Sequence, residues 1–238
     1  MRVIILTLAL TVLFACNPAQ PKNHHVIVVV DITNSIDILP TKAELINHIQ
    51  PYLLEPKDGI EIGIVYVTDV HRNTKKVLSL PTGSTDIFAT ELDRKIQTNA
   101  FEKQLDTLFQ SIVTVKIGYD KSQIFKAINR ELTYLSKQEV SGTKQLIVYS
   151  DLQENSSLFS VHTKHNTSWK LPTPELAEFI QQEISIPFSL QGVGMNIIHT
   201  QTQEAEVIFD KMLEVYQHIY EPVGLKIIAD QYTKISIP

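Results

Sequence analysis

The chain has 238 residues, of which 43% are hydrophobic and 20% charged, as in ordinary globular proteins long enough to bury a large core. The formal net charge of −5, with lysines and arginines scattered along the chain, argues against a nucleic-acid-binding protein. The single cysteine excludes a disulfide bond within the chain.

Residues 1–15 have the pattern of a secretory signal peptide. After a short positive start, residues 3–14 are almost wholly apolar, a stretch too short to cross a bilayer as a helix. The stretch ends in Ala15-Cys16, which resembles the lipobox of bacterial lipoproteins. The resemblance implies that Cys16 is the first mature residue and carries acyl chains such as palmitate, two or three of which anchor a protein firmly to a membrane.

Residues 16–25 are expected to form the lipidated cysteine and its tether, followed by one folded domain over 26–238. The tether contains two prolines and little apolar content, and His24 and His25 at its end are expected to be exposed. Asn17 follows the lipid site, which by resemblance to enterobacterial sorting favours the outer membrane. We therefore expect a protein of the bacterial cell envelope, lipid-anchored to the outer membrane and facing the periplasm.

The folded part alternates between strand and helix patterns. Residues 26–30 form an unbroken β-branched run, as a central parallel strand buried on both faces requires. Strands over 60–67 and 76–80 are close enough in sequence to form an antiparallel hairpin at a sheet edge. The other predicted elements are helices over 41–53, 85–113, 122–135, 173–184 and 203–220, and strands over 144–149, within 188–198 and over 225–228.

This alternation predicts an α/β fold with a doubly wound, mostly parallel sheet and one antiparallel edge strand. Binding sites of such sheets lie at the carboxyl ends of the strands. Two predicted strands end in an aspartate there, Asp31 and Asp151. In the first of these loops, Asp31, Thr33 and Ser35 alternate and can turn one carboxylate and two hydroxyls toward one point. Such hard oxygen ligands suit Mg²⁺, although these residue types also form turns and helix caps.

The loop beginning at Asp31 resembles the DxTxS motif of von Willebrand factor A (vWA) domains. Ser122 stands where the family's second loop has a threonine, and Asp120 nearby is an alternative ligand. Asp151 matches the aspartate of the family's third loop, Ser/Thr-Asp-Gly, but Leu152 replaces the glycine, a change that can re-aim the loop. The resemblance covers roughly residues 26–228 and implies a Rossmann-like vWA domain.

The resemblance further implies a metal-ion-dependent adhesion site (MIDAS) for Mg²⁺, or else Mn²⁺ or Ca²⁺. The implied ligands are Asp31, Thr33, Ser35 and Ser122, with Asp151 directly bound or acting through water. One coordination position would accept an acidic residue of a partner protein, so that the domain mediates a protein–protein interaction and is not an enzyme.

Two alternatives to an adhesion module stay open. One is a lipid-tethered structural scaffold with a vestigial metal site. The other is a metal-dependent phosphatase, because a strand that ends in Asp with a Thr two residues on resembles the start of haloacid-dehalogenase phosphatases. Those enzymes need an aspartate as general acid where Thr33 stands, and a hydroxyl cannot supply that acid at a useful pKa.

Overall fold

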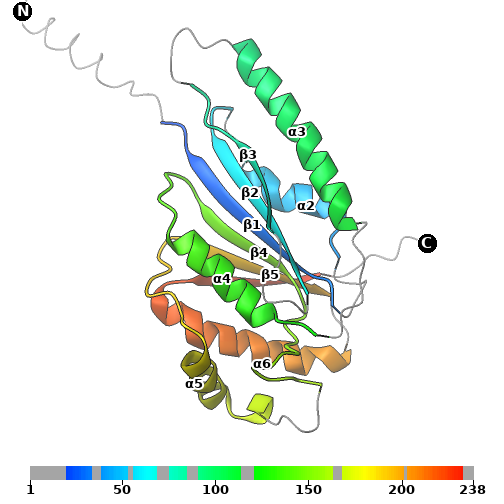
Figure 1. Ribbon diagram of the computed structural model, residues 1–238, viewed down its shortest axis with the longest axis vertical. Helices are drawn as coiled ribbons and strands as arrows, with labels where there is room; N and C mark the ends of the chain where they lie inside the picture. Colours follow the sequence, from blue (N-terminus) through cyan, green and yellow to red (C-terminus); the bar gives the residue numbers. More distant parts are fainter. Residues whose placement is uncertain are drawn as a thin grey trace, which may run out of the picture.

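The centre of the molecule is a twisted six-stranded sheet in the order β3-β2-β1-β4-β5-β6 (Figure 1). The computed structural model describes residues 20–33, 39–52, 56–68, 75–84, 91–113, 121–162, 168–200 and 203–232. The strands are β1 (Asn23–Asp31), β2 (Gly59–Val67), β3 (Lys75–Leu80), β4 (Lys144–Tyr149), β5 (Val193–Thr200) and β6 (Lys226–Tyr232). Neighbouring strands are parallel except β2 and β3, which are antiparallel. This is the strand order of doubly wound sheets, and the predicted fold class is confirmed.

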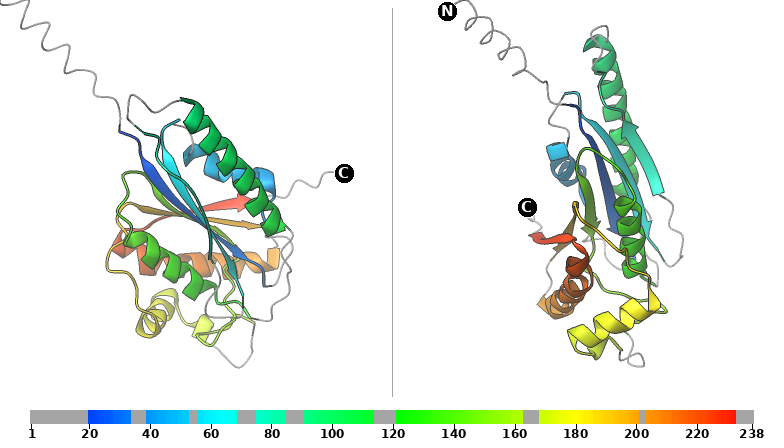
Figure 2. Two further views of the ribbon diagram at one scale, coloured as in Figure 1. Left: turned by 45° about the horizontal axis from the view of Figure 1, so that its top comes forward. Right: turned by 90° about the vertical axis from the view of Figure 1, so that its left-hand side faces the viewer.

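Helices cover both faces of the sheet (Figure 2). They are α2 (Lys42–Ile49), α3 (Glu91–Val113), α4 (Ile124–Ser136), α5 (Thr173–Glu183) and α6 (Gln203–Tyr220), with short 3₁₀ turns η2 (Gln50–Tyr52), η3 (Ser168–Lys170) and η4 (Glu221–Val223). Apolar side chains of α2 and α3 pack in the core on one face, and those of α4, α5 and α6 pack in the core on the other. Helix α2 begins with a reciprocal capping box formed by Thr41 and Glu44.

Strand β1 is the central element because its side chains enter both cores. Val26, Val28 and Val30 face the core shared with α2 and α3, whereas Ile27 and Val29 face the opposite core. All five are at most 2% exposed. Full burial of one such side chain contributes about 1.5–3 kcal/mol, so the β-branched run fixes this strand in the middle of the sheet.

The start of β1 corrects one expectation from the sequence. The strand begins at Asn23, and His24 and His25 are buried within it rather than exposed. The backbone N–H of Thr143 donates to His24 Nδ1 at 3.0 Å, which leaves the proton on Nε2 to face Asp58 Oδ2 at 3.3 Å. Both ring nitrogens of His24 therefore have partners, which makes its burial tolerable.

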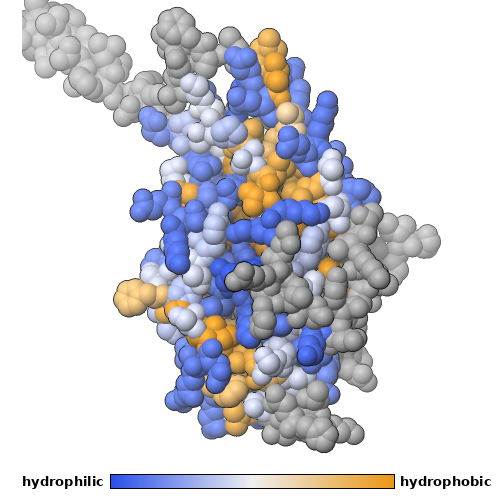
Figure 3. Space-filling model, viewed as in Figure 1, coloured by the Kyte–Doolittle hydropathy of each residue, from blue (hydrophilic) through white to orange (hydrophobic). Residues whose placement is uncertain are grey.

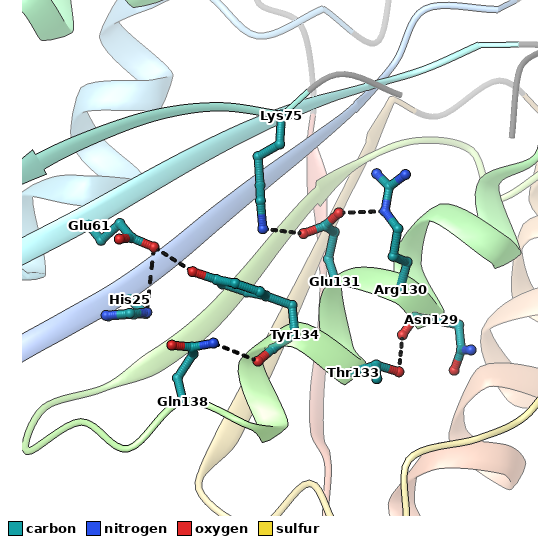
Figure 4. A network of polar contacts seen from close by, with 9 residues as sticks. All are labelled: His25, Glu61, Lys75, Asn129, Arg130, Glu131, Thr133, Tyr134 and Gln138. Atoms are coloured by element: carbon teal, nitrogen blue, oxygen red, sulfur yellow. Dashed lines mark hydrogen bonds and ion pairs between the residues drawn. The ribbon is translucent and has the colours of Figure 1, made fainter. Parts of the chain in front are cut away.

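A polar network ties α4 to the edge hairpin (Figure 4). The Tyr134 hydroxyl donates to Glu61 Oε1 on β2 at 2.7 Å. On β3, Lys75 Nζ donates to Glu131 Oε2 at 3.0 Å and lies 3.3 Å from the centroid of the Tyr134 ring. Arg130 Nε donates to the other oxygen of Glu131 at 2.8 Å. The nearly buried Glu131 carboxylate is thus paired on both sides.

The amino-terminal predictions concern residues that the structure does not describe. The expected signal peptide and Cys16 lie outside the described residues. Among the helices that are described, none combines the length and the apolar character needed to cross a bilayer.

Candidate metal centre

The carboxyl ends of β1 and β4 form the candidate site. The two strands are parallel neighbours, with Val30 paired to Tyr149, so Asp31 and the Ser150-Asp151 pair leave the sheet side by side. The position agrees with the rule that doubly wound sheets bind ligands at the carboxyl edge.

The Asp31 carboxylate accepts four hydrogen bonds from groups in three loops. Its Oδ1 accepts from the backbone N–H of Thr33 at 3.1 Å and from the Thr33 hydroxyl at 2.6 Å. Its Oδ2 accepts from the hydroxyls of Ser122 at 3.2 Å and Ser150 at 3.0 Å. All four residues are buried. One carboxylate and three hydroxyls from separate parts of the chain therefore meet at one point.

Ser122 is held in place by the segment that follows β4. Its backbone N–H donates to the carbonyl of Asn155 at 3.1 Å, and its carbonyl accepts from the N–H of Asn155 at 2.9 Å. Ser122 lies two residues before α4, so this two-bond bridge fixes the second loop against the third.

The third loop keeps a glycine-like turn although it has no glycine. Leu152 has a φ of 59°, in the left-handed region, and its side chain is fully buried. Its N–H donates to the Ser150 hydroxyl at 2.9 Å, and the N–H of Gln153 donates to Asp151 Oδ1 at 3.0 Å. A left-handed leucine is strained by about 1–2 kcal/mol, so burial of its side chain offsets the unfavourable backbone.

The site concentrates negative charge without a basic partner. Burial raises the pKa of Asp31, against hydrogen bonds that lower it. Burial, aided by the charge of Asp31, raises the pKa of Asp151 to about 6. In the part of the chain that the structure describes, no Lys or Arg forms an ion pair with either carboxylate. Hydrogen bonds from Thr33, Ser122 and Ser150, rather than an ion pair, are thus what stabilises the Asp31 carboxylate among the described residues.

Glu154 is a further buried carboxylate beneath the site, and the sequence analysis missed it. Its Oε2 accepts from the N–H of Phe125 in the first turn of α4 at 2.9 Å, while its Oε1 has no hydrogen-bond partner among the described residues. Burial raises its pKa to about 7, against hydrogen bonds from Phe125 and Ser156, and the charge of Asp31 adds to the increase. The Tyr216 hydroxyl is also buried without a hydrogen-bond partner among the described residues. Burial, with the nearby charges of Glu154 and Asp31, raises its pKa.

The structure thus brings together much of the predicted ligand set. Asp31, Thr33 and Ser122 are in direct contact, and Asp151 is coupled to Asp31 through its charge. Ser35 and the alternative ligand Asp120 lie outside the described residues. Ser150 was also missed, although its place beside Asp151 at the end of a buried strand is the signal that could have singled it out.

The donor chemistry fits a hard divalent cation. No group of three or more His, Cys, Asp or Glu side chains suited to a metal occurs in the described residues, so a site here depends on hydroxyl oxygens and water. Mg²⁺ accepts such a site because it keeps several waters and needs only one or two carboxylates. Zn²⁺, which prefers nitrogen and sulfur ligands, does not fit.

Comparison with known proteins yields structural likenesses alone. No protein-family model matches the chain, and no curated protein matches it. Human COPII-coat protein Sec24c is similar over 94% of this chain and 31% of its own, with a TM-score of 0.44 and 12% identity.

Two other solved structures are similar at comparable levels. The pilus adhesin SpaC from Lactobacillus rhamnosus GG matches 89% of this chain and 28% of its own, with a TM-score of 0.45 and 11% identity. The SpRpn10 VWA domain matches 87% of this chain and 88% of its own, with a TM-score of 0.34 and 11% identity. The chain thus spans less than a third of Sec24c and SpaC. These scores are too low to carry an argument, and the fold assignment rests on the sheet itself.

Proposed function

We propose that this chain is a lipid-anchored vWA-like protein that binds a divalent cation at Asp31 and, through that cation, a partner protein. The observation that carries the proposal is the meeting of a buried carboxylate and three hydroxyls, with the charge-coupled Asp151 nearby and no Lys or Arg ion-paired to either acid among the described residues. The strand order and the antiparallel edge strand support the vWA-like part of the proposal.

Each residue of the site would have a distinct part in holding Mg²⁺. The carboxylate of Asp31 supplies charge, and the hydroxyls of Thr33 and Ser122 supply neutral oxygens whose lone pairs are not all used. Ser35 follows them in the motif, and Asp151 accepts from water held at the site. A cation with so few negative ligands retains positive charge, which is what attracts an acidic side chain of a partner protein.

The membrane anchor completes the proposed function. Cys16 would carry the acyl chains, and the short polar segment after it would hold the domain close to the bilayer. The protein would then work at the bacterial cell envelope, at the periplasmic face of the outer membrane, with a partner protein as its ligand and no nucleic acid.

The test is isothermal titration of the full chain, in non-ionic detergent, with Mg²⁺ and with Mn²⁺. We expect binding near or below millimolar that is lost in Asp31→Asn and weakened about tenfold or more in Ser122→Ala. The matched control is Asp106→Asn on α3, which removes an exposed carboxylate paired with Lys42 of α2 and should bind as the wild type does. Thermal melting of each variant separates loss of binding from loss of the fold.

One observation favours the scaffold as a second candidate. The four hydrogen bonds to Asp31 satisfy both of its oxygens without any metal. A folded wild-type chain that bound neither ion would establish this second candidate, and the partner should then be sought in metal-free buffer.

A further inference from the structure

The amino edge of the sheet, opposite the candidate metal centre, carries the chain toward Cys16. His25 of β1 pairs with Lys144 of β4, which pairs with Val193 of β5, so these three strands start along one edge. Asn23 pairs with Gly59 at the start of β2 on the other side. The chain therefore enters the domain at the edge that faces away from Asp31.

The beginning of α3 is fixed at this same edge by Arg94. Its guanidinium donates to the carbonyls of Pro56 at 2.8 Å, Pro81 at 2.7 Å and Asp58 at 2.6 Å. The Asp58 side chain in turn accepts from the backbone N–H of Lys22 at 2.7 Å. One cluster of contacts thus joins the first turns of α3 to Lys22, which comes just before β1.

Two large apolar side chains flank Arg94 and point into solvent. Leu92 is 64% exposed and Ile96 is 58% exposed, one turn apart on α3. The residues that α3 buries, Phe101 and Phe109 among them, lie on the opposite side of the helix. Figure 3 shows the hydrophobic surface over this end of α3. Packing within the domain does not account for these two side chains.

A third apolar side chain projects from the same edge. Phe188 is 99% exposed and lies in the connection between α5 and β5, just before β5 begins at the amino edge. The connection is anchored on both sides of Phe188, because Pro187 is buried and Leu190 N–H donates to the Val223 carbonyl at 2.7 Å. A held loop with an exposed aromatic tip is suited to the interface between water and lipid.

We propose that Leu92, Ile96 and Phe188 contact the surface of the lipid bilayer in which Cys16 is anchored, so that the domain stands on its amino edge. This inference rests on the acylation of Cys16 in the proposed function. The seven residues from Cys16 to Lys22 make six steps that span at most about 20 Å even when fully extended, so the bilayer is within reach of this edge. The tether also raises the local concentration of lipid, so that three side chains suffice to orient the domain.

The experiment uses the acylated full chain in vesicles of phosphatidylethanolamine and phosphatidylglycerol. Because Cys16 is the single cysteine and acylation blocks its thiol, an introduced cysteine is the one site that takes a thiol-reactive, polarity-sensitive fluorophore. Ser189→Cys and Lys95→Cys place the probe beside Phe188 and between Leu92 and Ile96. Asp210→Cys is the matched control, because it lies beside Val207, which is 76% exposed on α6 beyond the carboxyl end of β5.

We expect blue-shifted emission and several-fold less quenching by iodide at positions 189 and 95, and full quenching at 210. Adding Phe188→Ser to the Ser189→Cys chain should restore quenching. Equal quenching at all three positions in vesicle-bound protein would overturn the inference and leave the anchor intact. A chain that lacks the acyl mass and does not float with the vesicles would overturn the anchor, and this inference with it.

Discussion

At the scale of single residues, the candidate site is ordered by hydrogen bonds that converge on one carboxylate. Asp31 accepts from Ser122 and Ser150 through one oxygen and from Thr33 through the other. A buried carboxylate is tolerable only when such donors satisfy it. The hydroxyls that would meet a cation are the same ones that keep the loops in place without it.

Ser150→Ala tests this dependence. The change leaves Asp31 Oδ2 with Ser122 alone and removes the acceptor of the Leu152 N–H. We expect a loss of about 1–3 kcal/mol in the free energy of unfolding, measured by urea denaturation in EDTA. Ser157→Ala, at an exposed position, is the control. Equal stability of the two variants would show that the bonds to Ser150 contribute nothing.

Leu152 leads to a prediction that reverses the usual ranking of alanine and glycine. Leu152→Ala loses the buried side chain but keeps the strained left-handed backbone. Leu152→Gly loses slightly more apolar surface but relieves that strain. We expect both variants to be less stable than the wild type, with the glycine variant about 1 kcal/mol more stable than the alanine variant in urea denaturation. The opposite order would mean that position 152 does not hold a positive φ in solution.

At the scale of elements, α4 is the helix on which the site depends, because Ser122 lies two residues before it and Glu154 accepts from its first turn. The pKa of Glu154 is about 7 in the folded chain, above the value of 4.5 for a free glutamate. The folded state therefore binds more protons than the unfolded state between these values, and stability falls as the pH rises from about 5 to above 7.

The prediction for Glu154 is that Glu154→Gln flattens this decline. The variant keeps an acceptor for the Phe125 N–H but has no charge to bury. Its free energy of unfolding relative to that of the wild type should therefore rise by up to about 3 kcal/mol between pH 5 and pH 8. The measurement is urea denaturation across that range in EDTA. If the free energies of unfolding of the two chains changed with pH in the same way, Glu154 would be ionised in the folded chain, and burial would not raise its pKa.

The attachment of α4 to the hairpin gives another prediction at this scale. Lys75→Met keeps the apolar stem over Tyr134 but leaves the buried Glu131 with Arg130 alone. Because the Lys75 side chain is 23% exposed, we expect a loss of about 1–3 kcal/mol, less than for a fully buried pair. The neighbouring Lys76→Met, at an exposed position, should lose less than about 1 kcal/mol. If both variants lost the same free energy of unfolding in urea denaturation, the pairing of Lys75 with Glu131 would contribute no more than an exposed lysine does.

The sequence predicted the elements well wherever apolar periodicity determines them. The bounds of β4 and α6 are as predicted, and so is the mostly parallel sheet with one antiparallel strand at its edge. The prediction was wrong at the start of β1, where His24 was expected to be exposed. Its burial depends on Thr143 and Asp58, which are distant in sequence. Glu154 was missed for the same reason, since a glutamate in a polar loop gives no local sign of burial.

At the scale of the whole molecule, the tether and the candidate metal centre lie at opposite edges of one sheet. The chain enters β1 at Asn23 and leaves it at Asp31, so a single strand connects the two ends. In the proposed arrangement the amino edge faces the lipid, and the open position at Asp31 faces the aqueous side. The partner protein can then approach without passing between the domain and the membrane.

This placement of β1 determines how the domain would carry mechanical force. A partner that pulls on Asp31 against the acyl chains at Cys16 stretches β1 along its own axis. Nine residue pairs with β2 and six with β4 flank the strand, and the evenly spaced hydrogen bonds of these parallel ladders slant across the direction of pull. Tension therefore loads both ladders in shear, with their bonds sharing the load, rather than peeling them apart one bond at a time. In the proposed arrangement, the buried strand at the centre of the fold would also transmit force between the membrane and the partner.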